Sequence, residues 1–141
     1  LRALPEWFGI EEALLQYASN ADRMPTIIAR HQTRAIGFLT IERHFPESGE
    51  VHCLALLPEY HRQGIGRRMQ WEAEQFLRDD GARFIQVKTV DASRDDPAYA
   101  LTRKFYRALG YAPLEVFPGL WGPANPCLML VKHLGESTEH P

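Results

Sequence analysis

The sequence predicts an α/β (α+β) fold in which helices flank a mixed, mostly antiparallel sheet, as a single domain over residues 1–141. Apolar and β-branched runs of strand length alternate with longer segments that have apolar residues at helical spacing. Glycines and prolines separate these segments. The resulting order is a helix, three strands, a helix, a strand, a helix and two strands. With 141 residues, 45% of them hydrophobic, the chain is long enough for one core and short for two.

The N-terminal part predicts a helix followed by a hairpin. Residues 10–22 carry apolar side chains at helical spacing. Trp7 and Phe8 precede them and are interpreted as a hydrophobic staple at the helix start, with the wall of a binding pocket as the alternative. The β-branched segments 25–31 and 35–43 predict a hairpin, and a second turn at 44–50 leads into a third antiparallel strand.

The central stretch, residues 51–69, reads as a strand, a loop and the start of a helix. Residues 51–57 are apolar and end at Pro58, which favours a buried strand. Gly64 and Gly66 carry no side chain, so the N–H groups of residues 63–67 can turn toward one cluster of ligand oxygens. Three arginines add positive charge, which favours a phosphate or pyrophosphate: Arg62, Arg67 and Arg68. The alternative is a flexible turn with solvated arginines.

The remaining elements follow by the same patterns. Residues 65–80 predict a helix with an apolar face that includes Phe76, and residues 84–90 predict a strand parallel to 51–57 if that helix is a crossover. Pro97 and Gly110 bound a helix whose expected face is Ala98, Leu101, Phe105, Ala108 and Leu109. Segments 111–117 and 127–134 predict two last strands, joined by a connection rich in proline and glycine.

Composition excludes several classes of protein. The formal net charge of -2 and the pI near 6.3 argue against nucleic-acid binding through a broad basic surface. Cys53 and Cys127 lie in apolar runs and are interpreted as reduced core residues, and the histidines show no metal-ligand spacing, so no metal is expected. Without a membrane-spanning run or a signal-like start, no membrane association is expected and a cytoplasmic protein is predicted.

The segment from His61 to Gly66, HRQGIG, resembles the GCN5-related N-acetyltransferase (GNAT) signature Gln/Arg-x-x-Gly-x-Gly/Ala, departing from it at His61. The resemblance runs from about residue 25 to 134. It implies acetyl-CoA (coenzyme A) as co-substrate and a splayed central pair of parallel strands, 51–57 and 84–90. The residues that it implies for coenzyme binding are Leu56, Leu57, Arg62, Gln63, Gly64, Ile65, Gly66, Arg67 and Arg68.

Acetyl transfer needs a proton donor, a base and a polarised thioester carbonyl. The resemblance places Tyr106 as the general acid, and helical geometry would allow its ring at the core edge. Glu50 and His52, beside Glu42 and His44, are the candidate bases, with water as the alternative. Strand alternation puts Glu50 and His52 on one face with Leu54 and Leu56, unless a bulge changes the phase. An N–H near Leu56 or Leu57 would polarise the carbonyl.

The function predicted from this resemblance is direct transfer of an acetyl group, or a longer acyl group, from acetyl-CoA to a primary amine in a ternary complex. The acceptor is expected to be a small-molecule or peptide amine, with Trp7, Phe8 and Trp121 as candidate pocket residues. Tyr99 stands where the family often has an asparagine that contacts the coenzyme. A non-catalytic coenzyme A sensor and a module that binds a phosphorylated partner remain alternatives, and a homodimer is a possible assembly.

Overall fold

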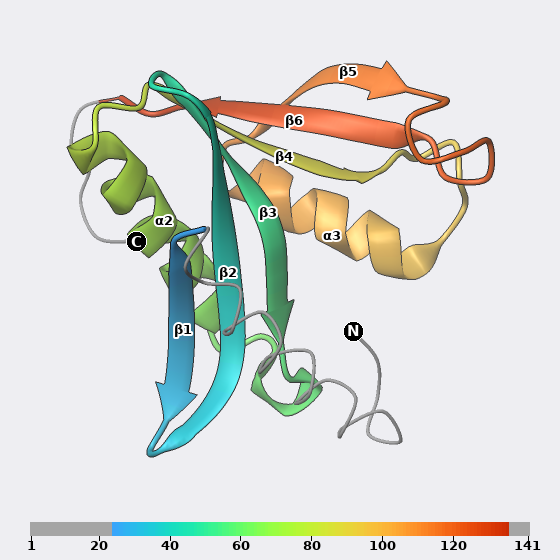
Figure 1. Ribbon diagram of the computed structural model, residues 1–141. Helices are drawn as coiled ribbons and strands as arrows, with labels where there is room; N and C mark the ends of the chain where they lie inside the picture. The colour runs from blue at the N-terminus through green and yellow to red at the C-terminus, as the bar shows by residue number, and fades with distance from the viewer. Residues whose placement is uncertain (1–23, 136–141) are drawn as a thin grey trace.

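The computed structural model describes residues 24–135, which form one six-stranded sheet with helices packed against it (Figure 1). The strand order is β1-β2-β3-β4-β6-β5. The elements are β1 (Thr26–His31), β2 (Arg34–Phe45), β3 (Ser48–Leu56), the short 3-10 helix η2 (Pro58–Tyr60), α2 (Ile65–Asp79), β4 (Phe84–Val90), α3 (Pro97–Ala108), β5 (Ala112–Phe117) and β6 (Cys127–His133). This architecture confirms the predicted mixed sheet. The predicted helix over 10–22, with Trp7 and Phe8, lies outside the described residues.

The centre of the sheet is the parallel pair β3 and β4, and the other neighbouring strands are antiparallel. α2 connects the two parallel strands, as a crossover requires. Pairing runs from Ser48 and Phe84 to Val51 and Val87. In the described chain no later residue of β3 pairs with β4, so the two strands part at Val51.

A β-bulge lies one residue beyond this point. Thr40 pairs with Cys53 and Ile41 pairs with Val51, which leaves His52 as an extra residue on β3. Of the two alternatives for this strand, the bulge holds, and the extra residue shifts the alternation so that Leu54 and Leu56 do not share the face of Glu50. Leu54 instead packs against the main core with Val51.

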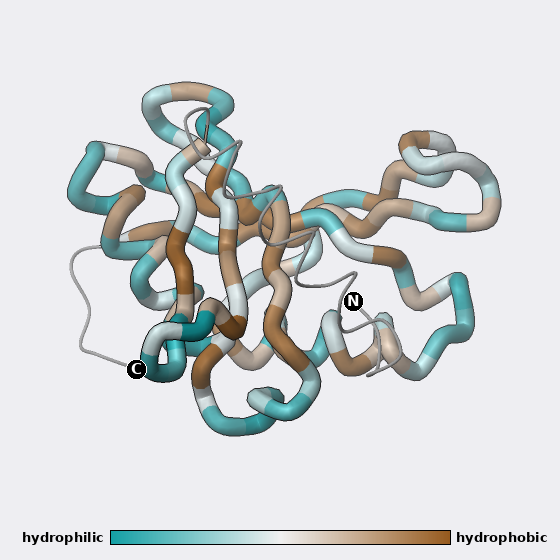
Figure 2. Tube along the Cα trace, turned by 60° about the horizontal axis from the view of Figure 1, so that its bottom comes forward, coloured by the Kyte–Doolittle hydropathy of each residue, from teal (hydrophilic) through white to brown (hydrophobic). Residues whose placement is uncertain are grey.

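The main core fills the space between the sheet and α2, and hydrophobic stretches along the strands contrast with hydrophilic turns (Figure 2). Met69, Ala73 and Leu77 face the sheet, whereas Phe76, which the sequence places on the same apolar face, is 42% exposed. Gln70 and Glu74 are buried in its place. Polar partners explain this: Gln70 accepts a hydrogen bond from Tyr111, and Glu74 binds the ammonium group of Lys132.

The buried face of α3 matches the predicted one in part, because Phe105 and Leu109 pack against the main core as expected. Leu101 is 61% exposed, whereas Tyr106 is buried in the core. The guanidinium of Arg103 donates to the carbonyl oxygen of Val90 at 2.6 Å and ties this helix to the end of β4. Among the helices of residues 24–135, none has the length and apolar character needed to cross a membrane.

Candidate active site

The start of α2 presents backbone N–H groups that have no partner in the helix. Arg68 donates the first intrahelical bond, to Gly64 at 3.0 Å, so the N–H groups of Gly64, Ile65, Gly66 and Arg67 precede it. No side chain of residues 24–135 caps this helix. Gly64 has φ 81°, a conformation that favours glycine, and a Cβ there would meet nothing within 4 Å. The geometry fits an anion with several oxygens.

The arginines around this helix start differ in their partners. Arg68 forms an ion pair with Glu72 at 2.9 Å and lies over the ring of Trp71. Arg62 and Arg67 are exposed, and no ion pair joins either of them to the described residues. Their charges, added to the positive helix end, are therefore available to a phosphate.

The loop before the helix is held by its own side chains. Gln63 donates from its amide to the carbonyl oxygen of Glu59 at 3.2 Å, and Arg62 has φ 63°, which is unusual for a residue with a side chain. His61, where the sequence departs from the family signature, hydrogen-bonds through Nε2 to the carbonyl oxygen of Leu56 at 2.8 Å. That contact fixes the loop against the end of β3.

Beyond the parting point, no strand of the described residues pairs with the edge of β3 that faces β4, and this edge carries backbone N–H groups. Leu57 donates its N–H to Ile36 of β2 at 2.9 Å, so this group is committed to the sheet. Because an antiparallel ladder alternates, the N–H of Leu56 points to the other edge. Of the two residues predicted to polarise the thioester carbonyl, Leu56 therefore has the suitable geometry.

Tyr106 lies beside the gap that opens between β3 and β4 beyond Val51, on the side of the sheet that the helices cover. Its ring meets Phe105 and Tyr111 edge-on, with centroids 5.2 and 5.3 Å apart. Burial, together with the nearby thiol of Cys53, raises the pKa of Tyr106 well above the ordinary 10.0. The phenol therefore keeps its proton at neutral pH.

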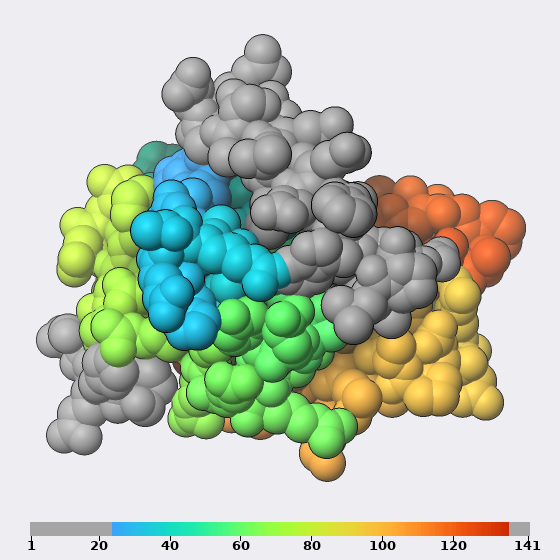
Figure 3. Space-filling model, turned by 90° about the horizontal axis from the view of Figure 1, so that it is seen from below, coloured from blue at the N-terminus to red at the C-terminus, as the bar shows by residue number. Residues whose placement is uncertain are grey.

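The helix start and Tyr106 belong to one region of the molecule. A Cβ on Gly66 would lie 3.4 Å from the ring of Phe105, the neighbour of Tyr106 in α3. The loop after β3 and α3 lie side by side on the face seen in Figure 3. A ligand that binds the helix start can thus extend along β3 toward Tyr106.

Glu50 lies on the opposite face of the sheet, in a network that the sequence did not reveal. Its carboxylate accepts hydrogen bonds from His44 at 2.6 Å, Gln86 at 3.0 Å and the Lys88 ammonium at 2.9 and 3.0 Å. Burial favours the neutral acid, but these donors outweigh it and lower the pKa of Glu50. Glu50 is therefore an ionised group with its oxygens occupied, which suits a fixed charge better than a proton acceptor.

His52 occupies the bulge and is far more accessible. Its side chain is 42% exposed, and its Nδ1 lies 3.5 Å from a carboxylate oxygen of Glu42 on β2. A carboxylate in this position orients the ring and leaves Nε2 to face a ligand. Of the two candidate bases, His52 has the access that proton transfer requires.

One cluster of potential metal-ligating side chains occurs in the described chain. Ligand atoms of Glu42, His44 and Glu50 lie within 4.8 Å of one another. However, both oxygens of Glu50 bind the ammonium of Lys88, which would repel a cation. The side chains therefore fit a network of ion pairs better than a metal site.

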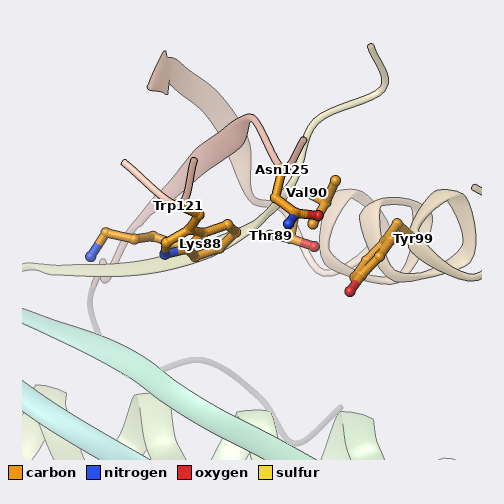
Figure 4. A pocket seen from close by; sticks show the side chains of 6 residues that line it. All are labelled: Lys88, Thr89, Val90, Tyr99, Trp121 and Asn125. Carbon is orange, nitrogen blue, oxygen red and sulfur yellow. The ribbon is translucent and has the colours of Figure 1, made fainter. Parts of the chain in front are cut away.

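A cavity of about 350 Å³ lies at the end of β4 (Figure 4). Its lining residues are Lys88, Thr89, Val90, Tyr99, Trp121 and Asn125. Trp121 was a candidate pocket residue, but Thr89, Val90 and Asn125 were not predicted. Alternation along residues 84–90 could have indicated Lys88, which projects from the face that carries Glu50.

Comparison with known proteins agrees with the family resemblance of residues 61–66. Residues 2–111 match the model of the acetyltransferase (GNAT) family. An uncharacterized N-acetyltransferase of Chlorobaculum tepidum is 26% identical over 103 residues, which cover 71% of this chain and 59% of that protein. The aligned part of the chain thus spans about three fifths of the relative's length.

Two solved structures share the fold. An aminoglycoside 6'-acetyltransferase type Ii has a TM-score of 0.72 at 22% identity, with 95% of this chain and 84% of that chain covered. A GNAT family acetyltransferase from Elizabethkingia anophelis with acetyl-CoA bound has a TM-score of 0.66 at 15% identity, with 86% and 82% covered. At these identities the likeness concerns the fold alone.

Proposed function

Because this chain belongs to the acetyltransferase (GNAT) family, we propose that it transfers an acetyl group from acetyl-CoA to a primary amine, directly within a ternary complex. The observation that carries the proposal is the start of α2, which no described side chain caps, beside the edge of β3 that no described strand pairs with. Coenzyme A has a pyrophosphate and an amide-containing arm. The first matches the N–H groups of the helix start, and the second matches a strand edge.

The residues that would hold the coenzyme follow from this match. The N–H groups of Gly64 to Arg67 bind the pyrophosphate, and Arg62 and Arg67 add their charges. The N–H of Leu56 serves the arm or the thioester carbonyl. When bound, acetyl-CoA supplies the activated acyl carbon.

Transfer forms a bond between nitrogen and carbon and breaks the bond between carbon and sulfur. The amine loses one proton and the departing thiolate gains one, so the protein must accept one proton and donate another. Tyr106 carries a proton at neutral pH and lies near Cys53 of β3, which suits donation to the sulfur. His52 accepts the proton of the amine, and Glu42 orients its ring.

These two groups reach the gap from opposite faces. Tyr106 belongs to the core between the sheet and α2, whereas Glu50, beside His52, bonds to Gln86 and Lys88 on the other face. A ligand between β3 and β4 can therefore meet the proton donor on one face and the proton acceptor on the other. Glu50 holds Lys88 and does not take part in proton transfer.

Calorimetry and a thiol-release assay test the proposal. Heat on titration with coenzyme A, together with thiol release from acetyl-CoA that depends on an added amine, is the expected result. Heat without release over a broad amine panel would favour a non-catalytic coenzyme A sensor of this fold. The panel includes an aminoglycoside, because one similar structure is an aminoglycoside 6'-acetyltransferase.

A further inference from the structure

We propose that the cavity at the end of β4 holds the acceptor, and that it selects a small amine bearing both a flat apolar group and a carbonyl or carboxylate oxygen. The inference rests on the proposed acetyl transfer and names its substrate class. At about 350 Å³, the cavity has room for on the order of a dozen water-sized groups.

The cavity lies next to the groups proposed for chemistry. Lys88, Thr89 and Val90 belong to the part of β4 beyond its pairing with β3. Lys88 lines the cavity and its ammonium binds Glu50. The Lys88 side chain therefore separates a bound amine from the network of Glu50, which adjoins His52.

Two aromatic side chains define the apolar ends of the cavity. Figure 4 shows Trp121 and Tyr99 on opposite sides, with Asn125 and Thr89 between them. Trp121 is 43% exposed, so part of its ring is accessible to a ligand. Arg94 lies over the Tyr99 ring, 5.8 Å from its centroid, and fixes it. Such rings favour a planar apolar group.

The polar groups between the two aromatic rings are mainly hydrogen-bond donors. The amide oxygen of Asn125 accepts a hydrogen bond from the guanidinium of Arg94, which leaves the amide nitrogen for a ligand. Figure 4 shows this nitrogen turned toward the Trp121 side of the cavity. The Trp121 indole adds another N–H donor. A ligand oxygen is the natural partner of such a set.

Charge argues against a polycationic acceptor. None of the six lining side chains is acidic. Lys88, one of the lining residues, already binds the carboxylate of Glu50. A ligand with several ammonium groups would find cations and donors there, so it would lose hydration without a compensating partner.

The first experiment compares four acceptors by their initial rates with acetyl-CoA: phenethylamine, phenylalaninamide, phenylalanine and kanamycin. We expect phenylalaninamide, phenylalanine or both to have a KM about 10-fold or more below that of phenethylamine, which corresponds to about 1.4 kcal/mol. The amide and the acid distinguish a carbonyl from a carboxylate oxygen. An equal or lower KM for phenethylamine or kanamycin would overturn the inference.

Three variants connect the preference to the cavity. Asn125→Asp keeps an oxygen for Arg94 but replaces the free N–H donors with a second oxygen. It should raise the KM of the oxygen-bearing acceptors about 10-fold at nearly unchanged kcat, and leave phenethylamine unaffected. Trp121→Ala should raise the KM of all three phenyl amines. Phe76→Ala, with the matched exposure of 42%, should change none. Equal effects of all three variants would contradict the assignment.

Coenzyme binding separates failure of this inference from failure of the proposed function. Heat with acetyl-CoA, combined with turnover of other amines but not of the phenyl set, would refute the acceptor class alone. A chain that gives no heat with acetyl-CoA would refute the proposed function and this inference with it.

Discussion

Replacing Glu50 with Gln tests whether this residue holds charge or transfers protons. Glu50 is 5% exposed, and its carboxylate accepts hydrogen bonds from three side chains. Glu50→Gln keeps the shape but removes the negative charge that faces Lys88. We expect the folded protein to lose stability while the pH profile of turnover keeps its shape.

The size of the loss follows from the network. Removing one partner of a buried ion pair typically costs about 3–5 kcal/mol, because the other charge stays unpaired. Lys88 is 24% exposed, so water partly screens it, and glutamine still offers one oxygen to its neighbours. The expected loss at pH 7 is therefore about 2–3 kcal/mol, a shift of about 1–2 M in the urea midpoint of a small domain.

The pH dependence has a definite sign. The folded protein lowers the pKa of Glu50 below its ordinary 4.5, so the stabilisation is complete above pH 4.5 and disappears as pH falls through the lowered value. Glutamine does not titrate. Urea unfolding of both proteins between pH 7 and pH 3 should show the difference shrinking below pH 4.5.

His52→Ala supplies the contrast, because this exposed side chain should contribute little to stability. We expect it to lower kcat/KM and remove the limb of the pH profile that reports the base. If Glu50→Gln instead removes that limb at unchanged stability, the assignment of Glu50 as a fixed charge is refuted.

Three further predictions concern the coenzyme, the acid and the helix packing. Tyr106→Phe should lower kcat about 100-fold with the Kd for coenzyme A nearly unchanged, whereas Tyr111→Phe should keep turnover; equal losses would remove the acid role. Arg67→Gln should raise the Kd for coenzyme A about 5-fold at low salt and less at high salt, by calorimetry; an unchanged Kd would place the pyrophosphate elsewhere. Glu74→Gln should lower the free energy of unfolding by about 2 kcal/mol, since it leaves Lys132 unpaired, and an unchanged urea midpoint would count against this pair.

The order of elements could be predicted from the sequence because its signals are local. Pro58, Gly64 and Gly81 mark ends of elements, and β4 has the predicted bounds, Phe84–Val90. The Ile85, Val87 and Thr89 face of β4 is buried as alternation predicts. These patterns depend on neighbours in the chain, which a sequence displays directly.

The side-chain networks could not be predicted, since they join residues from separate elements. Lys88 is 38 residues from Glu50, and Tyr111 is 41 residues from Gln70. The face of α3 differs from the prediction in part for the same reason, since Arg103 ties this helix to β4 by a contact that its own apolar spacing does not display. Nothing in the strand pattern identifies His52 as the extra residue of a bulge.

That single unpaired residue determines more than its own orientation. The bulge at His52 bends β3 where it leaves β4 and so helps to open the gap between the two strands. The gap therefore depends on the number of residues in each strand and not on their side chains. Evolution could exchange the side chains around the gap, and with them the acceptor, without closing it. A deletion of one amino acid there would do more harm than most substitutions.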